Sequence, residues 1–315
     1  MKREGSPKVT ALTAQTPPEL SKEKFLKEMQ SRHEPLFGQE GCNRLSRAVV
    51  VVAGNGGIGC QAIEILARAG VGTFRLIDPD VFDISNLNRQ TYATTETIGQ
   101  AKPEVAAKRI KEINPYANID KVFVEPANKQ NVEELVEGAD IVVEATTSRS
   151  SKYLFHDMAH KKHIPVVEGV GMSIGGQAWL TDYSDPRQKK VSMPTGLPFA
   201  NRLYYRLVGQ KKAANEQEIM ALDEYTNPLT KDLAPQSAGF AVHITASFVA
   251  GLAIKHLIGE AGGKKIRFPK RQVYLDLFNM KIRICSRFSV LLRMLFPHLK
   301  GKLSFGGNKG RSNSQ

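Results

Sequence analysis

The sequence of 315 residues has few cysteines and no long apolar run that is free of charge. Its three cysteines, Cys42, Cys60 and Cys285, are too few and too scattered for a disulfide framework or an all-cysteine zinc site. The most apolar stretch, residues 239–259, carries His243 and Lys255 among its polar residues, so we expect a buried or interface helix rather than a membrane span. The first 20 residues lack the apolar core of a secretory signal. Together these absences predict a reduced, cytoplasmic protein.

Acidic residues are nearly absent from the last part of the chain. Residues 264–315 hold 13 Lys and Arg but a single acid, Asp276, and so account for all but one of the 13 net positive charges. Such a segment, and above all the tail 285–315, indicates contact with an anionic surface, or else a solvated end that only aids solubility. Nucleic-acid binding is not expected, because no recognised motif or aromatic interleaving accompanies the charge.

Strand-like and helix-like segments alternate through the first half of the sequence. Runs of β-branched apolar residues predict strands, and apolar residues at helical spacing predict helices. We expect strands at 47–53, 74–78, 121–125, 140–146 and 164–169, and helices at 60–70, 103–114, 131–139 and 150–163. Strands alternating with helices are typical of βαβ units, so we predict an α/β fold with a Rossmann-like, doubly wound and mostly parallel sheet.

The two ends of the chain differ from this central part. Residues 1–20 predict a disordered arm, and a polar helix over 21–35 is expected to end at Pro35. After the parallel strands, the sequence predicts a strand, two helices and a closing hairpin at 176–183, 201–210, 239–259 and 272–284. We therefore expect a folded domain over 21–284 with a C-terminal antiparallel extension, followed by the basic tail.

A glycine-rich turn follows the first predicted strand. In GNGGIG, Gly54 suits the tight turn, Gly56 lets backbone N–H groups approach a phosphate, and Gly59 permits close packing of the next helix. Asp78 ends the next strand, where a carboxylate can accept ribose hydroxyl groups. NAD, FAD and ATP fit this pattern equally well, and a tight turn without any ligand is the structural alternative.

The residues after the second strand narrow the choice. They are DPDVFDISNLNRQ (78–90), followed by IGQAKPEVAAKRIKEINPYANI (98–119). Here the sequence resembles the ThiF/MoeB/HesA family, which is related to the adenylating domains of ubiquitin-activating enzymes. The matching residues are the glycine loop 54–59, Asp78, Asp80, the segment from Asn86 to Gln90, Gly99, Gln100, Lys102 and the segment from Ile113 to Pro115.

The resemblance implies an enzyme that uses ATP to adenylate a carboxylate. Its substrate would be the C-terminus of a ubiquitin-like or sulfur-carrier protein, or a small carboxylic acid, and relatives are commonly homodimers. Carried over by resemblance, the nucleotide site comprises Gly54, Gly56, Gly57, Gly59, Asp78, Asp80, Asn86, Arg89, Gln90, Lys102 and Thr147. Asp78 would bind the ribose, and Asn86 and Gln90 the phosphates. Arg89 and Lys102 would be catalytic, because they offset the charge that builds up on phosphate oxygens during the reaction.

Where the family has an aspartate that helps to hold Mg²⁺, this sequence has Thr147. A neutral hydroxyl cannot offset a divalent cation as a carboxylate does. Three alternatives stay open. Glu144 or Glu168 replaces the missing acid, phosphates and water hold the metal ion, or adenylation is lost.

Two further departures concern cysteine and histidine. No cysteine lies between Gln61 and Ile284, so we expect no enzyme thioester, and the absence of paired C-x-x-C motifs argues against zinc. His156 and His160 are spaced like metal ligands on a helix but lack a third ligand, and we interpret them as surface or packing residues.

These observations give one main hypothesis and two alternatives. The main hypothesis is an adenylyltransferase that works without a thioester step. The first alternative is a catalytically impaired nucleotide-binding relative that acts through partner binding, as the threonine at position 147 suggests. The second is a nicotinamide- or flavin-dependent oxidoreductase. It is the weaker alternative, because hydride transfer does not need the cluster of Arg, Gln and Lys that follows the glycine turn.

Overall fold

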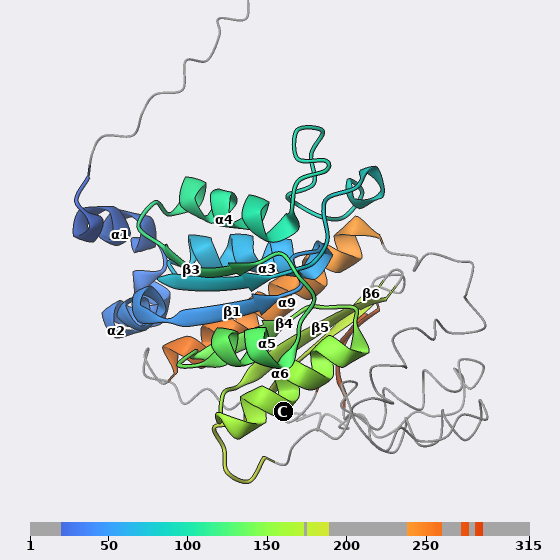
Figure 1. Cartoon of the computed structure of the whole chain (residues 1–315). Helices are drawn as coiled ribbons and strands as arrows, with labels where there is room; N and C mark the ends of the chain where they lie inside the picture. Colours follow the sequence, from blue (N-terminus) through green and yellow to red (C-terminus); the bar gives the residue numbers. More distant parts are fainter. Residues whose placement is uncertain (1–19, 173–174, 189–237, 260–271, 277–280, 286–315) are drawn as a thin grey trace, which may run out of the picture.

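The computed structural model describes residues 20–172, 175–188, 238–259, 272–276 and 281–285. These residues form one sheet with helices on both of its faces (Figure 1). The helices are α1 (Lys22–Gln30), α2 (Glu34–Arg47), α3 (Gly57–Arg68), the 3-10 helix η1 (Ile84–Asn86), α4 (Lys102–Ile113), α5 (Lys129–Val136), α6 (Arg149–Lys161) and α9 (Gly239–Ile258). The strands are β1 (Val49–Ala53), β2 (Thr73–Ile77), β3 (Asn118–Phe123), β4 (Ile141–Glu144), β5 (Val166–Met172), β6 (Gly175–Thr181), β7 (Gln272–Asp276) and β8 (Lys281–Cys285).

The sheet combines a parallel part with an antiparallel part. Its strand order is β3-β2-β1-β4-β5-β6-β7-β8. Neighbours from β3 to β5 run parallel, and neighbours from β5 to β8 run antiparallel. This confirms the predicted Rossmann-like sheet with an antiparallel extension. The order reverses between β1 and β4, and ligands of open α/β sheets bind at such a switch point, beyond the carboxyl ends of the strands.

The sheet has a hydrophobic core on each face. Because side chains of a strand alternate between faces, Val50 and Val52 of β1 enter one core, and Val51 and Ala53 enter the other. Residues of α3, α4 and α9 fill the first core, whereas residues of α5 and α6 fill the second. The two layers of helices pack on the sheet and hold its strands in place, and the candidate site lies at the carboxyl ends of these strands.

Helix α9 lies on the same face of the sheet as α3 and α4. Within the described part of the chain, it alone is long and apolar enough to cross a membrane by length and composition. It packs against α3, β5 and β6, and its buried residues include Val249, Ala250 and Ala253. These contacts are those of a core helix, as the sequence predicts for this segment.

The predicted end of the first helix at Pro35 is wrong. The chain forms two helices there, and Pro35 lies in the first turn of α2. Proline suits that position because its fixed backbone angle is helical and its missing N–H would have no partner in the first turn. The predicted helix 201–210, residues 1–19 of the predicted arm and residues 286–315 of the basic tail lie outside the described residues.

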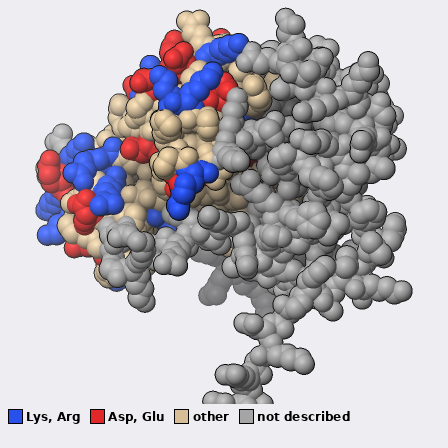
Figure 2. Space-filling view, turned by 90° about the horizontal axis from the view of Figure 1, so that it is seen from below, with Lys and Arg blue, Asp and Glu red and all other residues tan. Residues whose placement is uncertain are grey.

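The described surface shows no segregation of charge on the face seen in Figure 2. Lys and Arg side chains there adjoin Asp and Glu side chains, around an area of uncharged residues (Figure 2). The positive excess of the sequence is concentrated in residues 264–315 instead. The net charge of the whole chain therefore says little about the sheet and its site.

Candidate functional site

The candidate site lies where β1, β2 and β4 end. In the sheet register, Ala53 pairs with Ile77 on one side and with Glu144 on the other. The glycine turn follows β1, Asp78 follows β2, and Thr147 comes three residues after β4 ends. Parallel pairing thus brings together three segments that are far apart in the sequence.

The glycine turn is compact because two of its glycines leave no room for a side chain. Gly54 has φ +83°, a left-handed conformation that favours glycine. A Cβ atom on Gly54 would lie 2.7 Å from the carbonyl group of Ala145, and one on Gly59 would lie 1.8 Å from the carbonyl oxygen of Gly54. Gly56 is the N-cap of α3 and offers no capping side chain. The N–H groups of the first helical turn are therefore available to an anion.

Asp78 is hydrogen-bonded to this turn. Its Oδ2 accepts the N–H of Asn55 at 2.6 Å, and its Oδ1 accepts the N–H of Asp80 at 2.9 Å. Burial raises the pKa of the Asp78 carboxyl, although both N–H groups and the charge of Lys102 oppose this shift. The residue predicted to bind ribose is thus fixed beside the glycine turn.

Lys102 begins α4 and is held by Asp80. Its Nζ lies 2.8 Å from Asp80 Oδ2, and its backbone N–H donates to the Asp80 carbonyl at 3.0 Å. The Lys102 side chain is 7% exposed, whereas that of Asp80 is 65% exposed. A buried ammonium group therefore lies at this edge of the sheet, next to a carboxylate that faces solvent.

The loop around η1 brings two amide side chains to the site. Asn86 is buried and accepts the N–H of Asp83 through its Oδ1 at 3.2 Å, so this oxygen shapes its own loop. Gln90 is 5% exposed and lies against Gly56, where a Cβ atom would be 3.7 Å from its Nε2. Within the described part of the chain, the buried oxygens Oε1 of Gln90 and Oδ1 of Asn55 have no hydrogen-bond donor. Hydroxyl or amino groups of a nucleotide would satisfy such acceptors.

Arg89 reaches the site through its backbone. Its carbonyl oxygen lies 3.1 Å from Nε2 of His243 on α9, and 3.7 Å from the position of a Cβ atom on Gly57. Its guanidinium donates instead to the Ser85 carbonyl and to Oδ1 of Asn88, both at 2.9 Å. This side chain is held within its own loop, and the prediction that it contacts phosphate requires it to leave these partners.

Glu144, a possible metal ligand in the sequence, is already bonded within the chain. It is fully buried, and its Oε2 forms an ion pair with Nζ of Lys152 on α6. Its Oε1 accepts the N–H of Thr146 at 3.0 Å and the Thr146 hydroxyl as well. Thr147 is exposed next to this bonded group. Both carboxylate oxygens of Glu144, the acid nearest to Thr147 in the sequence, thus have partners within the chain.

Glu168, the other acid considered for the metal, is also buried in a polar cluster. It pairs with Glu144 in the sheet, and its Oε2 lies 2.9 Å from Nε2 of His156. Nδ1 of His156 lies 2.8 Å from the Tyr183 hydroxyl. Burial would raise the pKa of Glu168, but His156 and Lys152 lower it overall. His156 is therefore a buried member of this polar cluster and not a surface residue. No three His, Cys, Asp or Glu residues within the described ranges are arranged to hold a metal ion.

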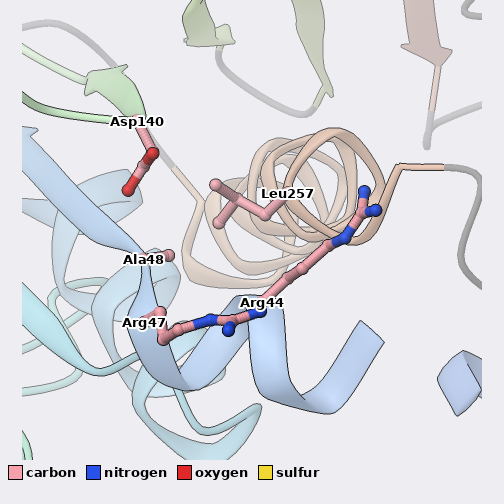
Figure 3. Close-up of a pocket in the computed structure, with 5 residues that line it drawn as sticks. All are labelled: Arg44, Arg47, Ala48, Asp140 and Leu257. Carbon is pink, nitrogen blue, oxygen red and sulfur yellow. The ribbon is translucent and has the colours of Figure 1, made fainter. Parts of the chain in front are cut away.

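Two other polar features lie away from this edge. A hollow of about 270 Å³ lies at the amino ends of β1 and β4, lined by Arg44, Arg47, Ala48, Asp140 and Leu257 (Figure 3). Arg44 is directed toward the end of α9, where it donates to the Ile258 carbonyl at 3.4 Å. This hollow lies at the opposite sheet edge and contains none of the predicted site residues.

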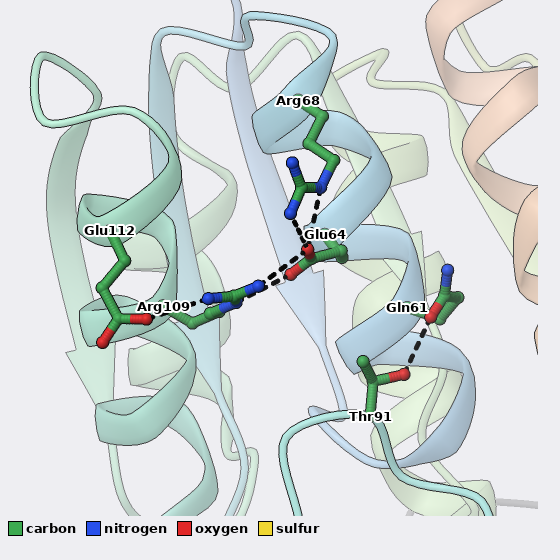
Figure 4. A network of polar contacts seen from close by, with 6 residues as sticks. All are labelled: Gln61, Glu64, Arg68, Thr91, Arg109 and Glu112. Atoms are coloured by element: carbon green, nitrogen blue, oxygen red, sulfur yellow. Dashed lines mark hydrogen bonds and ion pairs between the residues drawn. The ribbon is translucent and has the colours of Figure 1, made fainter. Parts of the chain in front are cut away.

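The second feature is an ion-pair network between α3 and α4. Glu64 accepts from Arg68 of its own helix and from Arg109 of α4, which also contacts Glu112 (Figure 4). Nearby, the Thr91 hydroxyl donates to Gln61 at 2.8 Å and so joins α3 to the loop that carries Gln90. The network braces the two helices whose first turns carry Gly57 and Lys102.

Sequence reasoning missed two residues of the site. The sequence predicts no role for Asn55, although its N–H donates to Asp78 and its buried Oδ1 has no hydrogen-bond donor among the described residues. It also predicts no role for Lys152, although Lys152 neutralises Glu144. Its position eight residues after a strand-ending glutamate could have indicated the pair, because the first two turns of a crossover helix pack over the end of the preceding strand.

The fold and site define an α/β protein with a glycine-rich strand-to-helix turn of the phosphate-binding type. The chain belongs to the ThiF family, whose model matches residues 30–289. The family resemblance predicted from the glycine turn and the segments after it is thereby confirmed.

Two curated relatives are each similar over 45% of the chain. The SAMP-activating enzyme E1 of Haloferax volcanii is 39% identical over 141 residues, which are 45% of this chain and 52% of that protein. The sulfur carrier protein adenylyltransferase of Thermus thermophilus is 37% identical over 143 residues, again 45% and 52%. The chain thus spans about half the length of these relatives.

Solved structures share the fold. PaaA superposes with a TM-score of 0.63 at 24% identity, over 86% of this chain and 76% of PaaA. MccB of E. coli, solved with ATP, gives 0.63 at 19% identity, over 84% and 76%. TcdA of E. coli, a tRNA N6-threonylcarbamoyladenosine dehydratase solved with AMP, gives 0.55 at 24% identity, over 76% and 97%. At such identities the likeness concerns the fold alone.

Proposed function

We propose that this chain uses ATP to adenylate a carboxylate, and that its substrate is the C-terminal carboxylate of a ubiquitin-like or sulfur-carrier protein. A small carboxylic acid is the other substrate class open to the same chemistry. Relatives named as activating enzymes or adenylyltransferases of such carriers support the reaction class. The observation that carries the proposal is the buried Lys102 ammonium, held by Asp80 beside Asp78 and the glycine turn.

In the proposed reaction, a carboxylate oxygen attacks the α-phosphorus of ATP. The bond between the α-phosphorus and its bridging oxygen breaks, and pyrophosphate leaves with the electron pair. Negative charge grows on the phosphate oxygens in the transition state, so fixed donors and cations there accelerate the step. Lys102 supplies the cation, the N–H groups at the start of α3 supply donors, and Gln90 Nε2 supplies another beside Gly56.

We further propose that no enzyme thioester forms. A thioester needs an accessible thiolate. Cys60 is fully buried, its Sγ donates to the Asn55 carbonyl at 2.9 Å, and burial raises the pKa of its thiol. Burial also raises the pKa of the Cys42 thiol. Neither group is a nucleophile, and the sequence has no cysteine between residues 61 and 284.

Pyrophosphate exchange with ATP tests the proposal. We expect exchange in the presence of a ubiquitin-like protein with a free C-terminus, and a loss of about 100-fold in Lys102→Met, the size typical of removing one charge-stabilising donor. Lys108→Met is the matched control, because Lys108 is an exposed residue of the same helix. Exchange that persists in Lys102→Met would contradict the assigned role.

A catalytically impaired relative is the second candidate function. It is favoured by the neutral Thr147 and by the ion pair that occupies Glu144. It predicts that ATP binds but does not exchange with pyrophosphate, whichever carboxylate is offered. A homodimeric state and a cytoplasmic location stay predictions under either function, and light scattering of the full chain tests the first.

A further inference from the structure

The Mg²⁺ that the family resemblance implies has no protein site that fits among the described residues. Mg²⁺ requires near-octahedral oxygen ligands, commonly one or two carboxylates together with phosphate oxygens. The acids at this edge are Asp78, Asp80, Glu144 and its sheet neighbour Glu168, whose Oε2 lies 2.9 Å from Nε2 of His156. Asp78 accepts two backbone N–H groups, Asp80 is paired with Lys102, and Glu144 is paired with Lys152 and Thr146. In the absence of nucleotide, each of these acids thus has a partner in the chain, and only the exposed Asp80 has a partner, Lys102, that a phosphate group can take over.

Unlike the Asp80–Lys102 pair, the Glu144–Lys152 pair has both members buried. The Glu144 side chain is 0% exposed and that of Lys152 is 10% exposed. A buried carboxylate without a partner is costly, and an ammonium in contact with it offsets part of that cost, although burial still raises the pKa of the Glu144 carboxyl overall. Although burial lowers the pKa of Lys152, the carboxylates of Glu144 and Glu168 raise it overall. Lys152 therefore keeps its positive charge inside the protein.

The same pair determines the path of the chain beside the glycine turn. Through its Oε1, Glu144 binds both the N–H and the hydroxyl of Thr146. The backbone of Ala145 and Thr146 lies so close to Gly54 that a Cβ atom there would be 2.7 to 2.8 Å from it. The N–H of Ala145 also donates to the Ala53 carbonyl at 2.8 Å. The hydrogen bonds from Thr146 to Glu144 therefore keep the backbone of residues 145 and 146 packed against the glycine turn.

We propose that Lys152 is a positioning residue for the nucleotide site: its ammonium neutralises Glu144, and Glu144 in turn fixes Ala145 and Thr146 against the glycine turn, so that Glu144 is not a metal ligand. This inference rests on the proposed nucleotide site. It follows that the chain itself ligates no divalent ion through Glu144, and that any Mg²⁺ enters only with the phosphates of ATP. A protein that does not hold the metal ion needs no carboxylate at position 147, so the exposed hydroxyl of Thr147 is compatible with ATP binding.

Calorimetric titration of the full chain with ATP, in buffer with Mg²⁺ and in buffer with EDTA, tests the first part. We expect the two dissociation constants to agree within about threefold. If the protein ligated the Mg²⁺ of bound ATP, removal of the ion by EDTA would weaken ATP binding by more than about tenfold. A fall in affinity of more than tenfold in EDTA would overturn the inference. The absence of any heat with ATP in both buffers would overturn the proposed nucleotide site instead.

Titration with Mn²⁺ alone, followed by electron paramagnetic resonance, decides the metal question without any nucleotide. We expect the signal of free Mn²⁺ to stay undiminished when the wild-type protein is added. Uptake of about one Mn²⁺ per chain that Glu144→Gln abolishes would show that this carboxylate is a metal ligand and would refute the inference.

Variants of the pair test the positioning role. Lys152→Met leaves a buried unpaired carboxylate, so we expect ATP affinity to fall about tenfold or more. The double variant Glu144→Gln and Lys152→Met removes both charges while the glutamine oxygen can still accept from Thr146. We expect it to bind ATP within about threefold of the wild type, even if the single variant folds poorly. Lys161→Met, an exposed position on the same helix, is the control.

The amide of Thr146 gives an independent readout. We expect its hydrogen exchange to accelerate in Lys152→Met and to return toward the wild-type rate in the double variant. A folded Lys152→Met variant with wild-type ATP affinity and wild-type exchange at Thr146 would show that the pair has no positioning role.

Discussion

Lys102 is buried, yet its ion-pair partner Asp80 is largely exposed. An ion pair with one solvent-exposed member contributes little to stability, because water screens the attraction. A phosphate group can therefore replace Asp80 at small cost. The arrangement keeps the ammonium at the site in the absence of ligand and leaves its charge available when a nucleotide binds.

This asymmetry predicts that function and stability separate at Lys102. In Lys102→Met we expect the free energy of unfolding to change by less than about 1.5 kcal/mol, because the side chain keeps its volume and Asp80 stays solvated. ATP binding should weaken at the same time by about tenfold or more. Thermal unfolding and calorimetry on one preparation check both values. Equal ATP affinity in wild type and variant would contradict the assigned role.

Thr147 offers the complementary test, the gain of a metal ligand. Because Thr147 is exposed, Thr147→Asp should fold like the wild type. We expect its ATP affinity to become dependent on Mg²⁺ by about tenfold, since the new carboxylate can share a cation with phosphate oxygens. Calorimetry with and without EDTA measures this change. Thr147→Asn, which adds bulk without charge, should stay independent of Mg²⁺.

At the scale of elements, the ion-pair network around Glu64 connects α3 to α4 (Figure 4). Burial would raise the pKa of Glu64, but hydrogen bonds from Arg109 and Arg68 lower it overall. A carboxyl whose pKa is lower in the folded state stabilises the protein above its unfolded pKa, and this stability is lost as the pH falls through the folded pKa. The brace between these helices is therefore strongest near neutral pH.

Glu64→Gln should lower the free energy of unfolding at pH 7 by about 1.5–3 kcal/mol, the range for hydrogen bonds to charged groups. The deficit should shrink as the pH falls below about 4.3, where the carboxyl of the unfolded chain takes up its proton. Urea unfolding of both proteins at pH 7 and pH 3.5 measures the difference. Glu112→Gln, at a residue whose side chain is 50% exposed, is the control and should change stability by less than about 0.5 kcal/mol.

Two glycines in helices predict opposite effects of the same substitution. Gly59→Ala places a methyl group 1.8 Å from the Gly54 carbonyl oxygen, so it should cost about 1–3 kcal/mol or more and disrupt the turn. Gly251→Ala on α9 meets no atom of the described residues within 4 Å and should stabilise the protein by about 0.5–1 kcal/mol. Denaturant unfolding of the two variants checks both signs, and a stable Gly59→Ala variant would mean that the turn is looser than described.

The helices and strands could be predicted from the sequence where a local pattern of apolar residues determines the secondary structure. The buried run before Gly54 and the periodic segments after it gave strands and helices within a few residues of β1, α3, β2 and α4. Pro35 was misread because a proline at the start of one helix and a proline after the end of another look alike in sequence. Residues that meet across the sheet, such as Glu144 and Lys152, were not recognised as a pair because their contact depends on how α6 packs.

At the scale of the whole molecule, the two edges of the sheet differ. The carboxyl ends of β1, β2 and β4 gather the glycine turn, two aspartates, Lys102 and Gln90. The amino ends carry the shallow hollow at Arg44 and Arg47 (Figure 3). The family resemblance could predict the residues of the first edge, but it could not predict that each acid there has a partner within the chain.

Hydrogen–deuterium exchange of the full chain with and without ATP tests the central claim most directly. Bound nucleotide slows the exchange of amides that it covers or orders. We predict protection in peptides that contain residues 54–59, 78–90 and 145–147, and none in peptides around Arg44 and Arg47. Protection confined to the Arg44 edge, or no protection anywhere at saturating ATP, would contradict the account.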